Sequence, residues 1–249
     1  MRNPNERKVF LAGAAGTIGK RLVPLLIQRG WQVVGTTRSA EKAQALAAAG
    51  VQPVVVDVFD ARAIERAVVE ARPAVVLHEL SDLPAGLDPA HLPDAIVRNA
   101  RIRSGGTANL VTAALEARVP RIVAQSIAWA YAPQNRPLRE DDPLDLGATG
   151  TRAISVGGVA ELERLVLGSP LFAGIVLRYG RLYGPGTGTD VAVAPSLHID
   201  AAAWATALAL EQGQPGIYNI ADPGPTVDTD KARTKLHWTA DWRAVEAHR

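Results

Sequence analysis

Residues 8–37 read KVFLAGAAGTIGKRLVPLLIQRGWQVVGTT, and this stretch decides the fold. Residues 8–12 form a short apolar run that is typical of a buried strand, and a glycine-rich turn follows it. Residues 18–29 carry leucine and isoleucine at helical spacing, and Gly30 follows directly as a stop signal. Residues 31–36 are again strand-like. The order strand, glycine turn, helix, strand predicts a parallel βαβ unit with a right-handed crossover.

The same alternation continues to about residue 130. Runs rich in β-branched residues are predicted as strands, and segments of helical periodicity are predicted as helices. The predicted strands are 54–58, 74–77 and 121–125, and the predicted helices are 41–49, 61–71 and 91–118. Because the apolar runs are continuous, we expect strands buried on both faces, in a parallel sheet that helices cover on each side.

The second half of the chain is less regular, and we expect it to supply most of any substrate pocket. The predicted elements are a loop at 135–150, a helix at 156–167, a strand at 174–177, a glycine-rich loop at 180–188, a helix at 201–211 and a strand at 216–220.

The composition excludes several classes of function. The chain has 249 residues, 47% of them hydrophobic and 21% charged, and it has no cysteine, so disulfides, thiolate nucleophiles and cysteine-ligated zinc are excluded. The five histidines lack metal-ligand spacing, so we expect no metal site. The formal charge of +2 is spread over dispersed basic residues, and we expect no nucleic-acid partner. Without a membrane-spanning run or a signal-peptide core, the sequence predicts a cytoplasmic protein that does not bind membranes.

The glycine-rich turn has the spacing of a phosphate-binding loop, Gly13-x-x-Gly16-x-x-Gly19. Gly13 permits the tight turn, Gly16 lets the backbone approach a pyrophosphate, and Gly19 lets the helix pack closely on the sheet. The unpaired N–H groups at the start of the helix then face the phosphates. The phosphate contacts are expected from Gly13, Ala15, Gly16, Thr17, Ile18 and Gly19. The alternative is an ordinary turn between a strand and a helix.

The end of the second predicted strand favours NADP(H) over NAD(H). A dinucleotide site that takes NAD usually has an acidic residue at this strand end, but here the sequence is Thr37-Arg38-Ser39, and Glu41 already belongs to the next helix. Arg38 can pair with a 2′-phosphate in bidentate fashion, and the hydroxyls of Thr37 and Ser39 can add hydrogen bonds. The alternative is that Arg38 is a surface arginine without a ligand.

The next two strand ends supply further candidates beside the cofactor. Asp57 and Val58 follow the third strand, where Asp57 either accepts a hydrogen bond from the adenine amino group or caps the following turn. Leu77 ends the fourth predicted strand, and His78 and Glu79 follow it. His78 and Glu79 can act as a pair that relays protons, or the backbone alone contacts the cofactor and the side chains lie elsewhere.

At this point the chain resembles the short-chain dehydrogenase/reductase superfamily, and within it the extended branch of NAD-dependent epimerases and dehydratases. The motifs that carry this resemblance lie at 13–19, 57–58, 75–78, 106–110, 125–131, 177–186, 198–202 and 216–219. The resemblance implies an α/β fold with a doubly wound Rossmann sheet of about seven parallel strands, and a dinucleotide lying across the carboxyl ends of the strands. It also implies a possible homodimer through the helices at 91–117 and 156–167.

The resemblance also implies the domain organisation. We expect a single Rossmann-type domain over 1–249, with a dinucleotide-binding half at 1–130 and a mixed half with a reduced substrate-binding region at 131–249. It places Arg178 and Tyr179, at the end of the sixth strand, beside the cofactor.

The chain departs from the family where the chemistry is expected. The family uses a Tyr-x-x-x-Lys pair, but Ser155 and Val159 stand at those positions. We predict that Ser126 orients the reacting oxygen and that Tyr131 or an ordered water handles the proton. The alternatives are a serine that satisfies the strand end and a tyrosine that serves packing. The segment at 187–197 is much shorter than the nucleotide-sugar region of the family, which argues against a nucleotide-sugar substrate.

These observations predict an NADP(H)-dependent oxidoreductase that transfers hydride to or from a small carbonyl or alcohol substrate. One alternative is a catalytically impaired sensor that binds a dinucleotide, because the Tyr–Lys pair is missing. Another is a nucleotide-sugar epimerase or dehydratase, as in the family.

Overall fold

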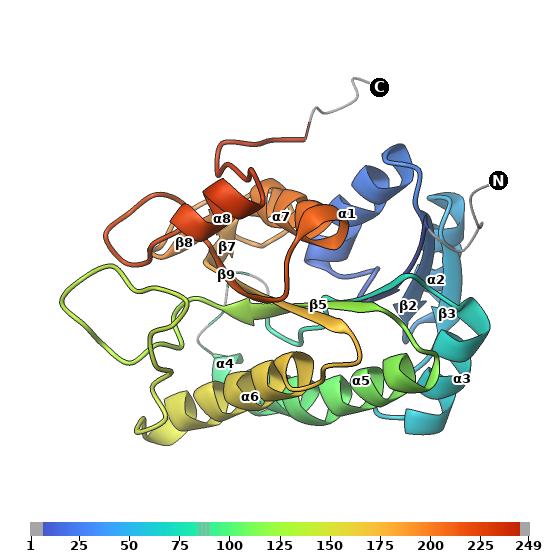
Figure 1. The fold of residues 1–249 in the computed structure, drawn as a ribbon, viewed down its shortest axis with the longest axis horizontal. Helices are drawn as coiled ribbons and strands as arrows, with labels where there is room; N and C mark the ends of the chain where they lie inside the picture. Colours follow the sequence, from blue (N-terminus) through green and yellow to red (C-terminus); the bar gives the residue numbers. More distant parts are fainter. Residues whose placement is uncertain (1–6, 85, 87, 89, 245–249) are drawn as a thin grey trace.

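Seven parallel strands form one sheet in a computed structural model that describes residues 7–84, 86, 88 and 90–244. The order is β3-β2-β1-β4-β5-β6-β9 (Figure 1). The strands are β1 (Lys8–Ala12), β2 (Gln32–Thr37), β3 (Gln52–Val55), β4 (Val75–His78), β5 (Arg121–Ile127), β6 (Ala173–Tyr179) and β9 (Gly216–Ile220). The predicted doubly wound sheet is thereby confirmed. The strand order reverses between β1 and β4, which is where open α/β sheets bind ligands.

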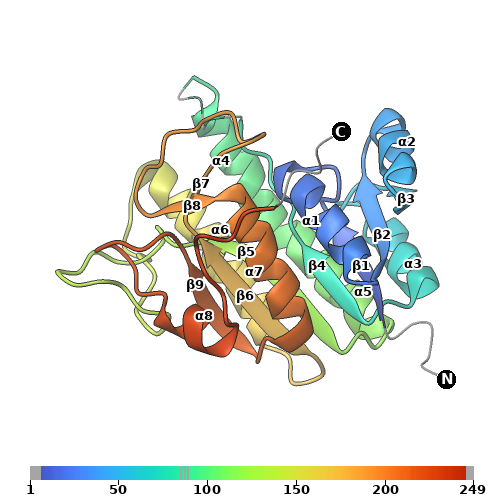
Figure 2. The same cartoon turned by 90° about the horizontal axis from the view of Figure 1, so that it is seen from above.

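Helices cover both faces of the sheet. They are α1 (Thr17–Gln28), α2 (Ala40–Ala48), α3 (Ala61–Ala71), α4 (Leu92–Arg101), α5 (Thr107–Glu116), α6 (Gly150–Leu167), α7 (Ile199–Gln212) and α8 (Asp230–Lys235). Helices α1 and α7 lie on one face, toward the viewer in Figure 2, and α3, α5 and α6 lie on the other. Within the described ranges, no helix has the length and apolar character needed to cross a membrane.

The strand β1 shows why both faces are covered. Its side chains alternate between the faces, as in any strand. Val9 and Leu11 belong to the apolar cluster under α1 and α7, whereas Phe10 and Ala12 belong to the cluster under α3 and α5. All four side chains are fully buried, so the continuous apolar run is explained by a core on each side.

Several element boundaries differ from those predicted. The predicted helix at 91–118 is divided into α4 and α5 by a π-helical turn at Ile102–Gly106. The helix α6 begins at Gly150 rather than at 156, and β3 covers 52–55 rather than 54–58. A π-helical turn has no signature in side-chain periodicity, because the apolar spacing on either side of it remains helical.

A second, two-stranded parallel sheet was not predicted. It pairs β7 (Arg181–Tyr183) with β8 (Ser196–His198), and the glycine-rich segment 184–195 joins them. Strands of three residues are too short for a pattern of alternation to identify them. This small sheet lies beyond the carboxyl end of β6, so it carries side chains from the second half of the chain to the switch point of the large sheet.

Candidate functional site

The glycine turn after β1 is closed so tightly that side chains do not fit in it. Gly13 has φ +96°, a left-handed conformation, and a Cβ atom on it would lie 2.7 Å from the carbonyl oxygen of Glu79. The N–H of Gly16 donates to the Gly13 carbonyl at 2.9 Å. Gly16 caps α1 without any side-chain hydrogen bond, and the first turn of α1 has no acidic residue. The N–H groups at this helix start are therefore available to an anion.

Two cavities adjoin this helix start. The first has a volume of about 320 Å³, and the predicted cofactor residues that line it are Gly13, Ala15, Gly16, Thr37, Arg38, Ser39, Asp57, Val58 and Glu79. The second has a volume of about 410 Å³, and the predicted residues that line it are Thr17, Ile18, Glu79, Ser126 and Tyr179. Glu79 borders both cavities, so they meet at the carboxyl end of β4. Of the predicted residues, Gly19, Leu77, His78, Tyr131 and Arg178 line neither of these two cavities.

Basic and hydroxyl side chains gather at the outer end of the first cavity. Arg38 is exposed at its rim and Lys42 lines the same cavity from the first turn of α2. Ser39 caps α2, because its Oγ accepts a hydrogen bond from the N–H of Lys42 at 3.3 Å. Sequence reasoning missed Lys42, although it follows Arg38 by only four residues and lies in the first turn of α2.

The turn after β3 uses Asp57 as a cap. Oδ1 of Asp57 accepts a hydrogen bond from the N–H of Phe59 at 3.0 Å, while the residue also lines the first cavity. The capping alternative is therefore what the structure displays, and contact with adenine stays a prediction.

His78, the last residue of β4, and Glu79, which follows it, send their side chains to different partners. Nε2 of His78 lies 3.0 Å from Oγ1 of Thr107 on α5, and Nδ1 accepts from the N–H of Leu80 at 3.3 Å. Burial, together with the nearby Arg103 charge, lowers the pKa of His78 to about 4. The ring is thus neutral at pH 7 and makes no direct contact with the Glu79 carboxyl group.

The Glu79 side chain turns toward α7. Its Oε1 accepts hydrogen bonds from the hydroxyls of Thr206 at 3.1 Å and Tyr179 at 3.3 Å. Oε2 is sealed from solvent and has no hydrogen-bond partner among the described residues. Burial raises the pKa of Glu79 to about 8, despite these hydrogen bonds. A buried carboxyl group therefore stays protonated at neutral pH beside the junction of the two cavities.

Ser155 and Val159, which stand where the sequence analysis expects the family's Tyr–Lys pair, lie on α6. Oγ of Ser155 accepts a hydrogen bond from Nη1 of Arg103 at 3.4 Å. Val159 is fully buried and packs with Ile127 and Val156. The absence of the Tyr–Lys pair is therefore not compensated at the same two positions.

Ser126 reaches the second cavity but its proton is engaged. Its hydroxyl donates to Oε1 of Glu163 at 2.9 Å. Arg178 holds the same carboxylate with Nε at 2.9 Å and Nη2 at 2.6 Å, and the pair is buried. This pairing with Glu163 raises the pKa of Arg178 against the effect of burial. Arg178 thus orients Glu163, and its side chain does not reach the predicted cofactor cavities.

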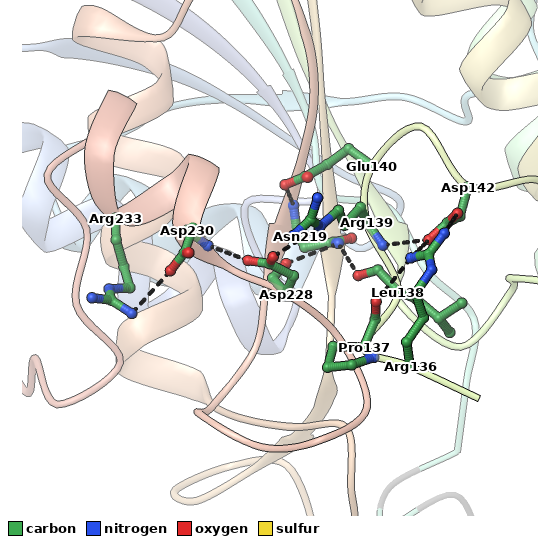
Figure 3. A network of polar contacts seen from close by, with 10 residues as sticks. All are labelled: Arg136, Pro137, Leu138, Arg139, Glu140, Asp142, Asn219, Asp228, Asp230 and Arg233. Carbon is green, nitrogen blue, oxygen red and sulfur yellow. Dashed lines mark hydrogen bonds and ion pairs between the residues drawn. The ribbon is translucent and has the colours of Figure 1, made fainter. Parts of the chain in front are cut away.

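Tyr131 is held away from both cavities by a polar network. Its hydroxyl donates to Oδ1 of Asn219 at 2.5 Å. Asn219 is fixed in turn, because its Nδ2 donates to the carbonyls of Leu138 and Asp228 and its N–H donates to Glu140 (Figure 3). Burial raises the pKa of Tyr131 to about 12. This position fits the packing alternative and does not favour Tyr131 as the proton donor.

Residues that sequence reasoning did not single out complete the second cavity. They include Arg103, Gln125, Trp129, Arg181, Leu182, Val191 and Val193. Three of them lie on the unpredicted elements, namely the π-helical turn and β7. The sequence pointed to this wall only through Gln125 and Trp129, which lie close to Ser126 along the chain.

Comparison with known families assigns the first half of the chain. A family model described as NAD(P)H-binding matches residues 13–153. A 3-diazoavenalumate denitrifying reductase from a Streptomyces species is 42% identical over 240 residues, which cover 88% of this chain and 77% of the relative. A 4-hydroxy-2-methyl-3-oxo-4-farnesyl-3,4-dihydroquinoline-1-oxide ketoreductase from Stigmatella aurantiaca is 30% identical over 196 residues. That match covers 78% of this chain and 54% of the ketoreductase, so the chain spans about half of that relative.

Solved structures share the fold over nearly the whole chain. UDP-glucose 4-epimerase from Thermotoga maritima superposes with a TM-score of 0.74 at 18% identity, covering 94% of each chain. WbmG from Bordetella bronchiseptica, in complex with NAD, superposes with a TM-score of 0.71 at 20% identity, covering 95% of this chain and 90% of WbmG. The doubly wound fold that the resemblance implies is confirmed by the sheet order and by these superpositions. The family-model match over residues 13–153 and the 42% identity to the Streptomyces reductase show that this chain belongs to the NAD(P)H-binding family.

Proposed function

We propose that this chain is an NADP(H)-dependent reductase that transfers hydride between the nicotinamide and a small carbonyl or alcohol substrate. The observation that carries the proposal is the meeting of the two cavities at Glu79, beside the start of α1. A dinucleotide whose pyrophosphate lies at this helix start has its adenosine half in the first cavity and its nicotinamide at the mouth of the second. Both curated relatives described above are reductases.

The preference for NADP(H) rests on the rim of the first cavity. Arg38 and Lys42 supply two cations there, and Ser39 adds a hydroxyl. A 2′-phosphate carries the charge that such a cluster binds, whereas the ribose of NAD offers only a hydroxyl to it.

The side chains of the second cavity position the substrate and do not supply a strong acid. The bound dinucleotide supplies the hydride. In the second cavity, the hydroxyl of Ser126 donates to Glu163, and the hydroxyl of Tyr179 is engaged with Glu79 and Thr206. The oxygen of Ser126 remains free to accept a hydrogen bond, so we propose that Ser126 holds an ordered water or the substrate hydroxyl. Correct placement alone gives a large rate enhancement, because hydride transfer needs close approach above all.

A deuterium-transfer experiment tests this function. The protein is incubated with NADPH carrying deuterium at C4 of the nicotinamide and with a panel of aldehydes, ketones and quinones. We expect deuterium in the product for at least one compound. The Ser126→Ala variant is expected to lower kcat about 10- to 100-fold, the range for a group that positions a proton donor, with an unchanged affinity for NADPH.

This experiment, together with a separate incubation with UDP-glucose, distinguishes the alternatives. Tight NADPH binding with no deuterium transfer to any compound selects a dinucleotide sensor, which the missing Tyr–Lys pair favours. Conversion of UDP-glucose without net oxidation of the nicotinamide selects an epimerase. Failure to bind either nicotinamide cofactor overturns the proposed function.

A further inference from the structure

Arg103 is a buried cation that forms no ion pair with an acidic side chain of residues 7–84, 86, 88 and 90–244. It lies on the π-helical turn between α4 and α5, and only 8% of it is exposed. Within the described part of the chain, its one hydrogen bond is the long contact of Nη1 with Oγ of Ser155 at 3.4 Å. Buried arginines are almost always paired, because an isolated charge loses its hydration.

The nearest acidic group is already engaged. Both carboxylate oxygens of Glu163 accept hydrogen bonds from Arg178, and Oε1 also accepts from Ser126. Burial lowers the pKa of Arg103 to about 10, which still leaves the guanidinium charged at neutral pH. Arg103 lines the second cavity. A buried, charged side chain therefore borders the space in which a ligand would bind.

The walls of the second cavity suit a flat, unsaturated molecule. Trp129, Leu182, Val191 and Val193 supply apolar surface. The guanidinium of Arg181 lies over the Trp129 ring, with 4.9 Å between its central carbon and the ring centroid. The indole is thus held in a fixed plane, and Arg103 supplies a separate cation in the same cavity. Aromatic and apolar walls with a few charged groups, here Arg103 and Arg181, are typical of a site for a small organic ion.

We propose that the second cavity binds a planar, conjugated carboxylic acid, with its carboxylate paired to Arg103 and its unsaturated body lying along Trp129. The planar fork of an arginine matches a carboxylate in bidentate fashion. The phosphates of the cofactor have separate partners at the start of α1 and around Arg38. This inference rests on the proposed function, because it places the substrate beside the nicotinamide, and it names the substrate class.

Binding of simple aryl acids tests the inference without requiring turnover. trans-Cinnamate, 4-coumarate and 2-naphthoate are titrated into the full chain in the presence of NADP⁺, and binding is followed by calorimetry. trans-Cinnamamide, which has the same shape without the charge, is the matched ligand control. We expect at least one acid to bind at millimolar concentration or below, with an affinity that falls as the salt concentration rises.

Variants of Arg103 then test whether this residue binds the carboxylate of the aryl acid. Arg103→Gln is expected to lose about 10- to 100-fold in affinity for the acid, as expected for removal of a charged hydrogen bond, while the weak affinity for cinnamamide is unchanged. Arg103→Lys keeps the charge without the fork and is expected to lose less. Arg164→Gln, which removes an exposed arginine of α6 that pairs with Glu161, serves as the control variant and is expected to leave binding unchanged.

Three results overturn the inference: no aryl acid binds, acid and amide bind equally well, or Arg103→Gln weakens NADPH binding instead of acid binding. Calorimetric titration of NADPH into the unmodified chain is run in parallel. If NADPH fails to bind, the proposed function fails, and the acid titration still reports on Arg103 by itself. If NADPH binds and the acids do not, only the substrate class is wrong.

Discussion

At the scale of single residues, we propose that the choice of cofactor depends on Arg38. We predict that Arg38→Ala weakens NADPH binding about 10- to 100-fold and changes NADH binding little, because only NADPH carries a 2′-phosphate that Arg38 can bind. Titration followed by tryptophan fluorescence measures both affinities, and Arg62→Ala, at an exposed arginine of α3, is the control. An equal loss for both cofactors, or no loss for either, would show that Arg38 is a surface arginine without a ligand.

Glu79 makes stability depend on pH in a defined window. Its pKa is about 8 in the folded protein and about 4.5 when unfolded, so the folded state binds more protons between these values. Stability therefore falls as pH rises from 4.5 to 8. His78, with a folded pKa of about 4 and an ordinary value of 6.5, has the opposite effect between pH 4 and 6.5. Between pH 6.5 and 8, the change in stability therefore reports the titration of Glu79 and not that of His78.

We predict that the chain loses about 2 kcal/mol of stability between pH 6.5 and 8 through Glu79, since each pH unit contributes about 1.4 kcal/mol. Glu79→Gln keeps the shape without the titration, so its stability curve is expected to be flatter over this window. Urea unfolding at several pH values measures the difference. Parallel curves for the two proteins would contradict the raised pKa.

At the scale of elements, the turn between β1 and α1 has no room for a side chain at Gly13. We predict that Gly13→Ala lowers stability by about 1–3 kcal/mol, because the left-handed backbone is strained and the added Cβ meets the carbonyl of Glu79. Loss of NADPH binding is expected with it, since the helix start moves. Thermal unfolding and fluorescence titration measure the two effects.

Gly157 on α6 is the matched control for this prediction. A Cβ atom added there meets nothing within 4 Å, and its φ is not left-handed. Gly157→Ala is therefore expected to stabilise the chain by about 0.5–1 kcal/mol, as alanine does in a helix interior. If Gly13→Ala and Gly157→Ala change the stability alike, close packing is not the reason why position 13 is a glycine.

Elements with strong local patterns were predicted well, and those set by distant contacts were not. The strand Lys8–Ala12 and the helix Ala61–Ala71 have the predicted bounds, because apolar spacing and flanking stop signals define them locally. The glycine spacing also predicted the first cavity. The second cavity was only partly predicted, because Arg103 depends on a π-helical turn and Arg181 on a strand that pairs with residues 196–198. No local pattern encodes either contact.

For the whole molecule, we propose the homodimer that the family resemblance implies. Val97 on α4 and Ile154 on α6 are 52% and 42% exposed, and the two helices pack side by side on one face. We predict that the double variant Val97→Glu/Ile154→Glu is a monomer by light scattering, because charges in an apolar interface are costly. Leu171→Glu, at a 77% exposed residue outside both helices, is expected to remain a dimer. The same mass for all three proteins would contradict this interface.

The parallel sheet places both cavities at the carboxyl ends of its strands, and this has a practical consequence. The opposite rim, where Arg118 lies exposed just before β5, takes no part in either cavity. Since the chain has no cysteine, Arg118→Cys would create a unique thiol there. A dye or a solid support attached through that sulfur would leave the side of the molecule that holds the two cavities facing outward and unobstructed.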